Sequence, residues 1–240
     1  MKRFPIDFSK PIALTVGMAG FINKVMRTWS DDLKREFERE FRKHYQGYFD
    51  QFMASDEQDE GVAAGVHNLI DQEIERHRDQ YRDIKCKKGC SACCHQLVQI
   101  THAEARLLAL CVTEGEIRID RELLARQASG PEDETDWWRL PMEENGCVFL
   151  DRHTGKCRVY EHRPTACRKY FVTSDPHWCG TREGNQRVSV INMYPVEIVA
   201  SAALNCDHQA GPLPRLLAQA LAENDTLLTG RGAGKGARKP

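Results

Sequence analysis

Apolar and aromatic residues recur at steps of three and four along residues 25–52, a spacing that places them on one face of a long amphipathic helix. The positions are Val25, Trp29, Leu33, Phe37, Phe41, Tyr45, Tyr48 and Phe52. Ser30 and the two aspartates that follow it can cap a helix, so the run is either one helix or two helices with a break near Ser30. We expect this face to pack against the protein core rather than to bind a partner.

The same spacing predicts helices further along the chain. An acidic linker, residues 55–61, precedes a second helical pattern over residues 62–74, which continues as a very polar segment up to Cys86. Thr101 and Glu104 have the spacing of a capping box, so a helix is predicted to begin at about Thr101. The remaining predicted helices cover residues 120–127, 195–204 and 214–223.

Two stretches have the pattern of β-strands. Residues 146–160 alternate apolar and polar side chains around a turn at residues 153–155, which predicts a β-hairpin with Cys147 on one strand and Cys157 on the other. The register of this hairpin is open, because a slip of one residue turns the side chains of a strand to the opposite face. Pro164 can open a short helix that carries Cys167, and residues 187–193 are predicted to form a strand.

Composition and charge narrow the class of protein. The 240 residues are 41% hydrophobic and 29% charged, and the formal net charge of -1 provides no overall attraction to nucleic acid or anionic lipid. The apolar run of residues 12–22 is shorter than the ~20 residues that span a bilayer, and no signal-peptide cleavage pattern follows it. We therefore expect a cytoplasmic protein with no membrane or nucleic-acid partner, whose ten cysteines are reduced.

Four of these cysteines, Cys86, Cys90, Cys93 and Cys94, fall within nine residues in the stretch KCKKGCSACCH. Adjacent cysteines do not both find ordinary disulfide partners easily, whereas a metal ion or cluster gathers several thiolates around one centre. The neighbouring lysines, Lys85, Lys87 and Lys88, are expected to lower the pKa of the thiols. The stretch therefore predicts one part of a metal site.

Other cysteines are candidates for the remaining ligands, namely Cys147, Cys157, Cys167 and Cys179. His95, His153, His162 and His177 are alternative ligands, and Arg163 and Arg168 flank Cys167, where each can hydrogen-bond sulfur or form a structural ion pair. We expect Cys111 to be a buried apolar side chain and Cys206 an outlying thiol.

The spacing leaves the kind of metal centre open. Zinc takes four ligands, which a C-x2-C pair such as Cys90 and Cys93 and a distant pair can supply. An iron–sulfur cluster also takes cysteine thiolates with close spacing and a remote ligand. The C-x3-C-x2-C spacing further occurs in radical S-adenosylmethionine enzymes, but Ala92 stands where those enzymes commonly have an aromatic residue, and the chain lacks alternating strands and helices for a barrel.

The segments KCKKGCSACC, GCVFLD and GKCRVYEHRPTACRKY together resemble the YkgJ-like cysteine-cluster family of zinc- or iron-chelating proteins, in the order of the family's motifs. The resemblance covers residues 85–170. It implies metal chelation through Cys86, Cys90, Cys93, Cys94, Cys147, Cys157 and Cys167. The family is similar to flagellin lysine N-methylases, so the resemblance also admits a methyl-transfer reaction.

We predict a mainly helical α+β protein in which a small, metal-nucleated cysteine core with a β-hairpin is flanked by helices. The predicted regions are an N-terminal helical region (1–84), a cysteine-rich metal-binding domain (85–210), a C-terminal helix (211–229) and a disordered basic tail (230–240). The leading function is binding of zinc or iron, including an iron–sulfur cluster, in a structural or electron-transferring role. The alternatives are a cluster-dependent protein lysine methyltransferase, which leaves open whether the protein is an enzyme, and a zinc-stabilised module that holds a protein partner through its N-terminal helices.

Overall fold

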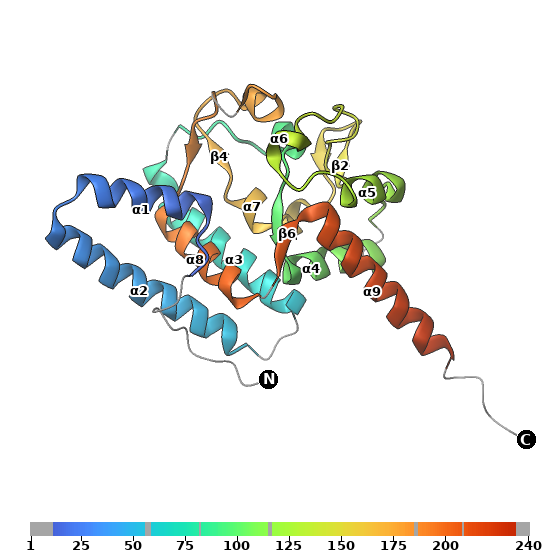
Figure 1. Cartoon of the computed structure of the whole chain (residues 1–240), viewed down its shortest axis with the longest axis horizontal. Coiled ribbons are helices and arrows are strands. Elements are labelled where there is room, and N and C mark those ends of the chain that lie inside the picture. The colour runs from blue at the N-terminus through green and yellow to red at the C-terminus, as the bar shows by residue number, and fades with distance from the viewer. Residues whose placement is uncertain are drawn as a thin grey trace, which may run out of the picture.

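The computed structural model of the protein describes residues 12–55, 59–81, 83–114, 117–184, 187–207 and 209–233. It confirms the mainly helical α+β class, with long helices in one half of the molecule and a cysteine-rich half built from short elements (Figure 1). No helix within these ranges is both long enough and apolar enough to cross a membrane.

The N-terminal helices form one hydrophobic core with a helix from late in the chain. The helices α1 (Val16–Thr28) and α2 (Asp31–Met53) form a hairpin, and both pack on α8 (Tyr194–Cys206), which also contacts α3 (Asp59–His77) (Figure 1). Of the two alternatives for residues 25–52, the structure has two helices with a break near Ser30, which is the N-cap residue of α2. Phe41, Tyr45 and Phe52 of the predicted face are buried in this core.

The end of the predicted apolar face nearest Ser30 is not covered. Trp29 and Leu33 are 37% and 48% exposed, and they lie where α1 joins α2, at the end of the hairpin that projects beyond α8 (Figure 1). The periodicity of a helix face predicts which side is apolar, but the length of the partner helix decides how much of that side is buried.

A second core lies between the two halves of the molecule. It brings together α4 (His102–Thr113), α5 (Arg121–Ala128) and α9 (Leu213–Ala233), together with the antiparallel strands β1 (Gln99–Thr101) and β6 (Ala210–Pro212). The predicted capping box is confirmed, since the Thr101 side chain accepts from the Glu104 amide and the Glu104 side chain accepts from the Thr101 amide. Phe149 and Val159 of the cysteine-rich half are buried in the same core.

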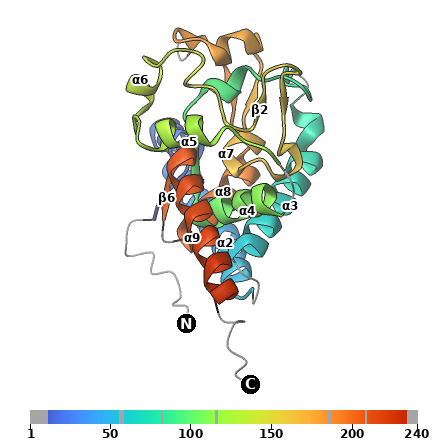
Figure 2. The ribbon, with the colours of Figure 1, turned by 90° about the vertical axis from the view of Figure 1, so that its right-hand side faces the viewer.

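The cysteine-rich half consists of one-turn helices and two-residue strands (Figure 2). The predicted hairpin is present as β2 (Leu150–Asp151) and β3 (Lys156–Cys157), paired with Leu150 opposite Cys157. The short helix predicted after Pro164 is α7 (Thr165–Arg168), and the strand predicted over residues 187–193 is only β5 (Val190–Ile191), paired with β4 (Phe171–Val172). One short helix, η1 (Arg78–Gln80), precedes the cysteine-rich half. The other short helices of that half are η2 (Ala92–His95), α6 (Glu134–Trp137), η3 (Tyr160–His162) and η4 (Pro176–Gly180).

The predicted boundaries between regions stay predictions. The helix α8, inside the predicted cysteine-rich domain, packs on α1, α2 and α3, whereas α9 packs on α4 and α5. The helix α9 runs to Ala233 and so includes the first residues of the predicted tail. The rest of that tail, residues 234–240, lies outside the described residues, as do residues 1–11 and the centre of the predicted acidic linker, residues 56–58.

Candidate metal centre

The eight cysteines predicted as ligands come from four separate segments of the cysteine-rich half. All ten cysteines of the chain are free thiols. Cys93 and Cys94 lie on η2, and this helix packs on η4, which carries Cys179; a Cβ atom on Gly180 would lie 3.1 Å from the Ala92 carbonyl oxygen. The amide of Cys147 also donates a 2.8 Å hydrogen bond to the carbonyl of Cys94. The first cysteine segment thus contacts two of the later ones.

The electrostatic interactions among the sulfurs centre on Cys93. A thiolate at Cys93 raises the pKa of six other thiols, those of Cys86, Cys94, Cys147, Cys157, Cys167 and Cys179. The remaining interactions fall into two sets. In the first set, Cys147 and Cys167 interact with each other and with both Cys94 and Cys157. In the second set, Cys179 interacts with Cys86 and Cys90. Each of the eight predicted sulfurs therefore lies within electrostatic range of at least two others, including Cys179, which lies outside the motifs that carried the resemblance.

Burial keeps most of these thiols protonated in the absence of a cation. It raises the pKa of Cys147 to about 12 and that of Cys179 to about 11, and it also raises the pKa values of Cys86, Cys157 and Cys167. Cys93 is the exception, because a hydrogen bond from the Cys94 thiol lowers the pKa of Cys93 to about 7. Several thiolates in this space therefore require a positive charge beside them.

The backbone around the sulfurs is arranged to support that negative charge. The backbone amides of Phe149 and Leu150 oppose the rise that burial causes in the pKa of Cys147, and the amide of Val159 does the same for Cys157. The Cys86 sulfur accepts a 3.4 Å hydrogen bond from the amide of Val172. Amide donors that point at sulfur favour the thiolate over the thiol, which is the form that binds metal.

The donor set therefore fits a thiolate-bound metal, since the cysteine-rich half offers eight sulfurs and amide donors to three of them. Within the described ranges, no three side chains of histidine, cysteine, aspartate or glutamate already stand close enough together to hold one ion. Metal binding would thus require a local shift of the short elements that carry the cysteines, so that the sulfurs come closer to one another.

The two arginines beside Cys167 have different roles. Arg168 is buried, and its guanidinium forms an ion pair with Asp71 at 2.5 Å and a 2.6 Å hydrogen bond to the Glu161 carbonyl, so it is a structural residue. Arg163 instead stacks on the ring of Tyr160 at 4.3 Å, and its charge lowers the pKa values of Cys86, Cys93 and Cys157. Arg163 is therefore a cation close to three of the predicted ligand sulfurs.

The predicted lysines and histidines are less closely tied to the sulfurs. Lys88 is exposed and pairs with Glu161 at 3.5 Å. The Nδ1 atom of His95 is hydrogen-bonded to the Asn145 side chain at 2.9 Å, and the ring of His177 lies edge-on to that of Trp178. The two cysteines that were not predicted as ligands also lie apart, because Cys111 packs on the second core and the Cys206 sulfur contacts the Phe49 carbonyl.

Two supporting features were not predicted from the sequence. The Tyr170 hydroxyl is hydrogen-bonded to the Cys179 sulfur, and Gln96 donates to both the Tyr170 hydroxyl and the Cys179 carbonyl at 3.1 Å. The carboxylate of Glu104, beyond its role in the capping box, accepts from the Thr165 amide at 2.6 Å, at the start of the helix that carries Cys167. Gln96 and Tyr170 stand at the edges of the cysteine motifs, and this position was the signal in the sequence for their contacts with Cys179. The capping box was the signal for the contact between Glu104 and Thr165.

Comparison with known proteins agrees with this arrangement. Residues 85–186 match the family model CxxCxxCC, whose description is "Putative zinc- or iron-chelating domain". No curated protein and no solved structure matches the chain. The matched range begins at the residue before Cys86 and includes all eight predicted ligands. Residues 85–186 are therefore similar to the CxxCxxCC family of chelating domains over the stretch that carries the predicted ligands.

Proposed function

We propose that the protein binds zinc or iron through thiolates of Cys86, Cys90, Cys93, Cys94, Cys147, Cys157, Cys167 and Cys179, and that the bound metal holds the cysteine-rich half together. The observation that supports this proposal is the electrostatic interaction of Cys93 with six other predicted ligand thiols from all four segments, with backbone amides near three of the sulfurs. Because thiolates require a reducing environment to stay available to metal, we expect the protein to act in the cytoplasm.

A structural role follows from how little else links these segments. The strands β2 to β5 are two residues long, and α6 and α7 are single turns. Short elements of this kind contribute few backbone hydrogen bonds and little cooperative stability of their own. Metal bound across the four segments would cross-link them and restrict the unfolded chain, as structural zinc sites do.

An electron-transferring role is the second candidate, and the number of sulfurs favours it. Eight thiols are twice what one tetrahedral zinc takes, so the set suits either two zinc ions or an iron–sulfur centre. The charge of Arg163 beside Cys86, Cys93 and Cys157 would offset the negative charge of a multi-thiolate centre and raise its reduction potential.

Metal analysis of anaerobically purified protein tests the proposal. We expect stoichiometric metal. Iron and sulfide with broad visible absorbance would identify a cluster, whereas colourless protein with zinc would identify a structural site. Protein that is metal-free, fully folded and reactive at all ten thiols would refute the proposal.

A pair of matched variants locates the ligands. Cys93→Ser removes the sulfur with the most interactions, and we expect it to lose metal and thermal stability. Cys111→Ser makes the same chemical change in the second core, and we expect it to keep the full metal content. Equal metal content in the two variants would contradict the assignment.

A further inference from the structure

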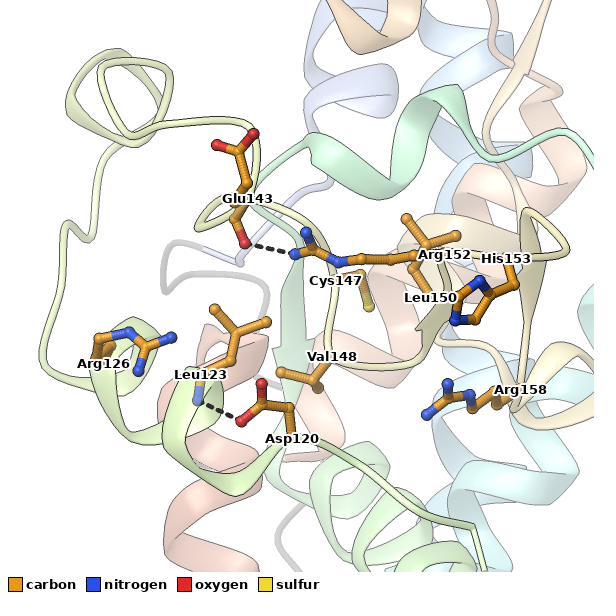
Figure 3. Close-up of a pocket in the computed structure, with 10 residues that line it drawn as sticks. All are labelled: Asp120, Leu123, Arg126, Glu143, Cys147, Val148, Leu150, Arg152, His153 and Arg158. Atoms are coloured by element: carbon orange, nitrogen blue, oxygen red, sulfur yellow. Dashed lines mark hydrogen bonds between the residues drawn. The ribbon is translucent and has the colours of Figure 1, made fainter.

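A pocket of about 370 Å³ opens beside the cysteine-rich half, between α5 and the β2–β3 hairpin (Figure 3). The side chain of Cys147 forms part of its wall, and Leu123 and Val148 line its apolar side. The cysteine motifs do not predict this pocket, because most of its polar side chains come from residues outside them. The pocket has room for a small molecule or ion, which would lie next to the wall that Cys147 forms.

Three guanidinium groups reach into this pocket from different sides. Arg126 extends from α5, Arg152 from the turn after β2, and Arg158 from the residue after β3 (Figure 3). Two of them are held in place by neutral acceptors: Arg158 donates to the Arg118 carbonyl at 2.7 Å, and Arg152 donates to the Glu143 carbonyl. A carbonyl fixes the direction of a guanidinium without neutralising its charge.

The nearby carboxylates do not balance these charges. Among the residues that the structure describes, Arg126, Arg152 and Arg158 form no ion pair within 4.0 Å, although the charge of Arg158 contributes to lowering the pKa of Asp151 in the β2–β3 hairpin. One oxygen of Asp120 caps α5 by accepting from the Leu123 amide at 2.8 Å, and Figure 3 shows the Glu143 carboxylate turned away from the arginines. The pocket thus presents three arginine charges, with the Asp120 carboxylate in its lining and the Asp151 carboxylate in electrostatic range of Arg158.

We propose that this pocket binds a small tetrahedral oxyanion, namely phosphate or the phosphoryl group of a phosphate monoester. Guanidinium groups match phosphate oxygens through paired hydrogen bonds, and three groups that approach from different directions suit the oxygens of a tetrahedron better than the planar pair of a carboxylate. The side chain of His153, which also lines the pocket, adds a ring nitrogen for a further contact. The proposal does not depend on which metal, if any, the sulfurs bind.

Titration calorimetry of the purified full-length protein, with its metal content measured in parallel, tests the proposal. The probes are inorganic phosphate, methyl phosphate and acetate at matched ionic strength. We expect saturable binding of phosphate or methyl phosphate and much weaker binding of acetate. Binding of methyl phosphate alone would identify the monoester as the ligand, and binding of both would identify the phosphoryl group as what is recognised. Absence of saturable binding by either phosphate probe, or acetate binding of equal strength, would overturn the proposal.

Variants assign the binding to the arginines. Arg126→Gln and Arg158→Gln are each expected to weaken phosphate binding about tenfold or more, because each removes a charge-assisted contact. Arg121→Gln is the matched control, since Arg121 lies on the same helix but pairs with Asp225 at 3.8 Å and does not line the pocket. If Arg158→Gln disturbs folding through the lost contact with the Arg118 carbonyl, Arg126→Gln decides the result. Unchanged affinity in a folded Arg126→Gln variant would place the anion elsewhere and refute the assignment.

Discussion

Replacement of Glu104 by glutamine tests how the helical half positions the cysteine-rich half. The Glu104 carboxylate is only 4% exposed and accepts three hydrogen bonds, from His67 Nε2 at 3.0 Å, the Thr165 amide at 2.6 Å and the Thr101 amide at 3.0 Å. It therefore joins α3, α4 and the start of α7 at one buried point. Burial alone would raise the pKa of Glu104, but the hydrogen bonds from His67 and the two amides outweigh it and lower the pKa.

The size of the effect follows from these contacts. Glutamine keeps one oxygen and the shape of the side chain, but it replaces the second acceptor by a donor and removes the charge. Loss of one hydrogen bond and conversion of two others from charged to neutral acceptors costs roughly 2–4 kcal/mol of folding free energy. Because α7 carries Cys167, we also expect weaker metal retention.

Urea unfolding followed by circular dichroism at pH 7 measures the change. Glu75→Gln is the control, because Glu75 is exposed and its ion pair with Arg78 at 3.1 Å should contribute less than about 0.5 kcal/mol. A group with a depressed pKa stabilises the fold above its unfolded pKa, near 4.5, and loses that effect as pH falls. The difference in free energy of unfolding between the natural protein and the Glu104→Gln variant should therefore narrow as pH falls below about 4.5. If Glu104→Gln lost no more unfolding free energy at pH 7 than Glu75→Gln, the reasoning would be refuted.

Three further results are expected. Gly17→Ala should destabilise the fold by about 1–3 kcal/mol in urea unfolding, because the new Cβ would lie 2.5 Å from Glu197 Oε1, an atom that Lys169 holds by a 2.8 Å hydrogen bond. Gly20→Ala is the control on the same helix: its Cβ meets nothing within 4 Å, so it should stabilise the fold by about 0.5–1 kcal/mol. Metal affinity, measured by competition with a chelator, should rise between pH 6 and 8, since protons on thiols of raised pKa compete with the metal; a flat profile would argue against thiolate ligands. Removal of metal by a strong chelator should lower the melting temperature and expose additional thiols to titration, and an unchanged melting curve would count against a structural role.

Local features of the fold could be read from the sequence. The N-cap at Ser30, the capping box of Thr101 and Glu104 and the helix after Pro164 each depend on residues within one turn of one another. Such signals act over short stretches of chain, so pattern and spacing are enough to locate them. The assignment of residues 85–186 to a metal-chelating family was predicted for the same reason, since closely spaced cysteines form a local motif.

Contacts between distant segments could not be read in this way. The hairpin register, with Leu150 opposite Cys157, depends on the turn and on packing against the second core. The contact of Glu104 with His67 and Thr165 requires three helices to be placed first. The convergence of Arg126 and Arg158 likewise depends on the position of α5 against the hairpin, which no spacing in the sequence encodes.

The packing of α9 also limits what the family match says about autonomous folding. The matched range ends at residue 186, yet Leu213, Leu216, Leu217 and Leu221 of α9 are buried against Phe149 and Val159 within that range. At about 1.5–3 kcal/mol for each leucine, their removal would cost roughly 6–12 kcal/mol, which is comparable to the whole stability of a typical domain. A fragment truncated at the limits of the match should therefore fail to fold alone. The range of the family match shows where the cysteines of the candidate metal centre lie in the chain. The smallest unit able to fold also includes α9, which follows that range.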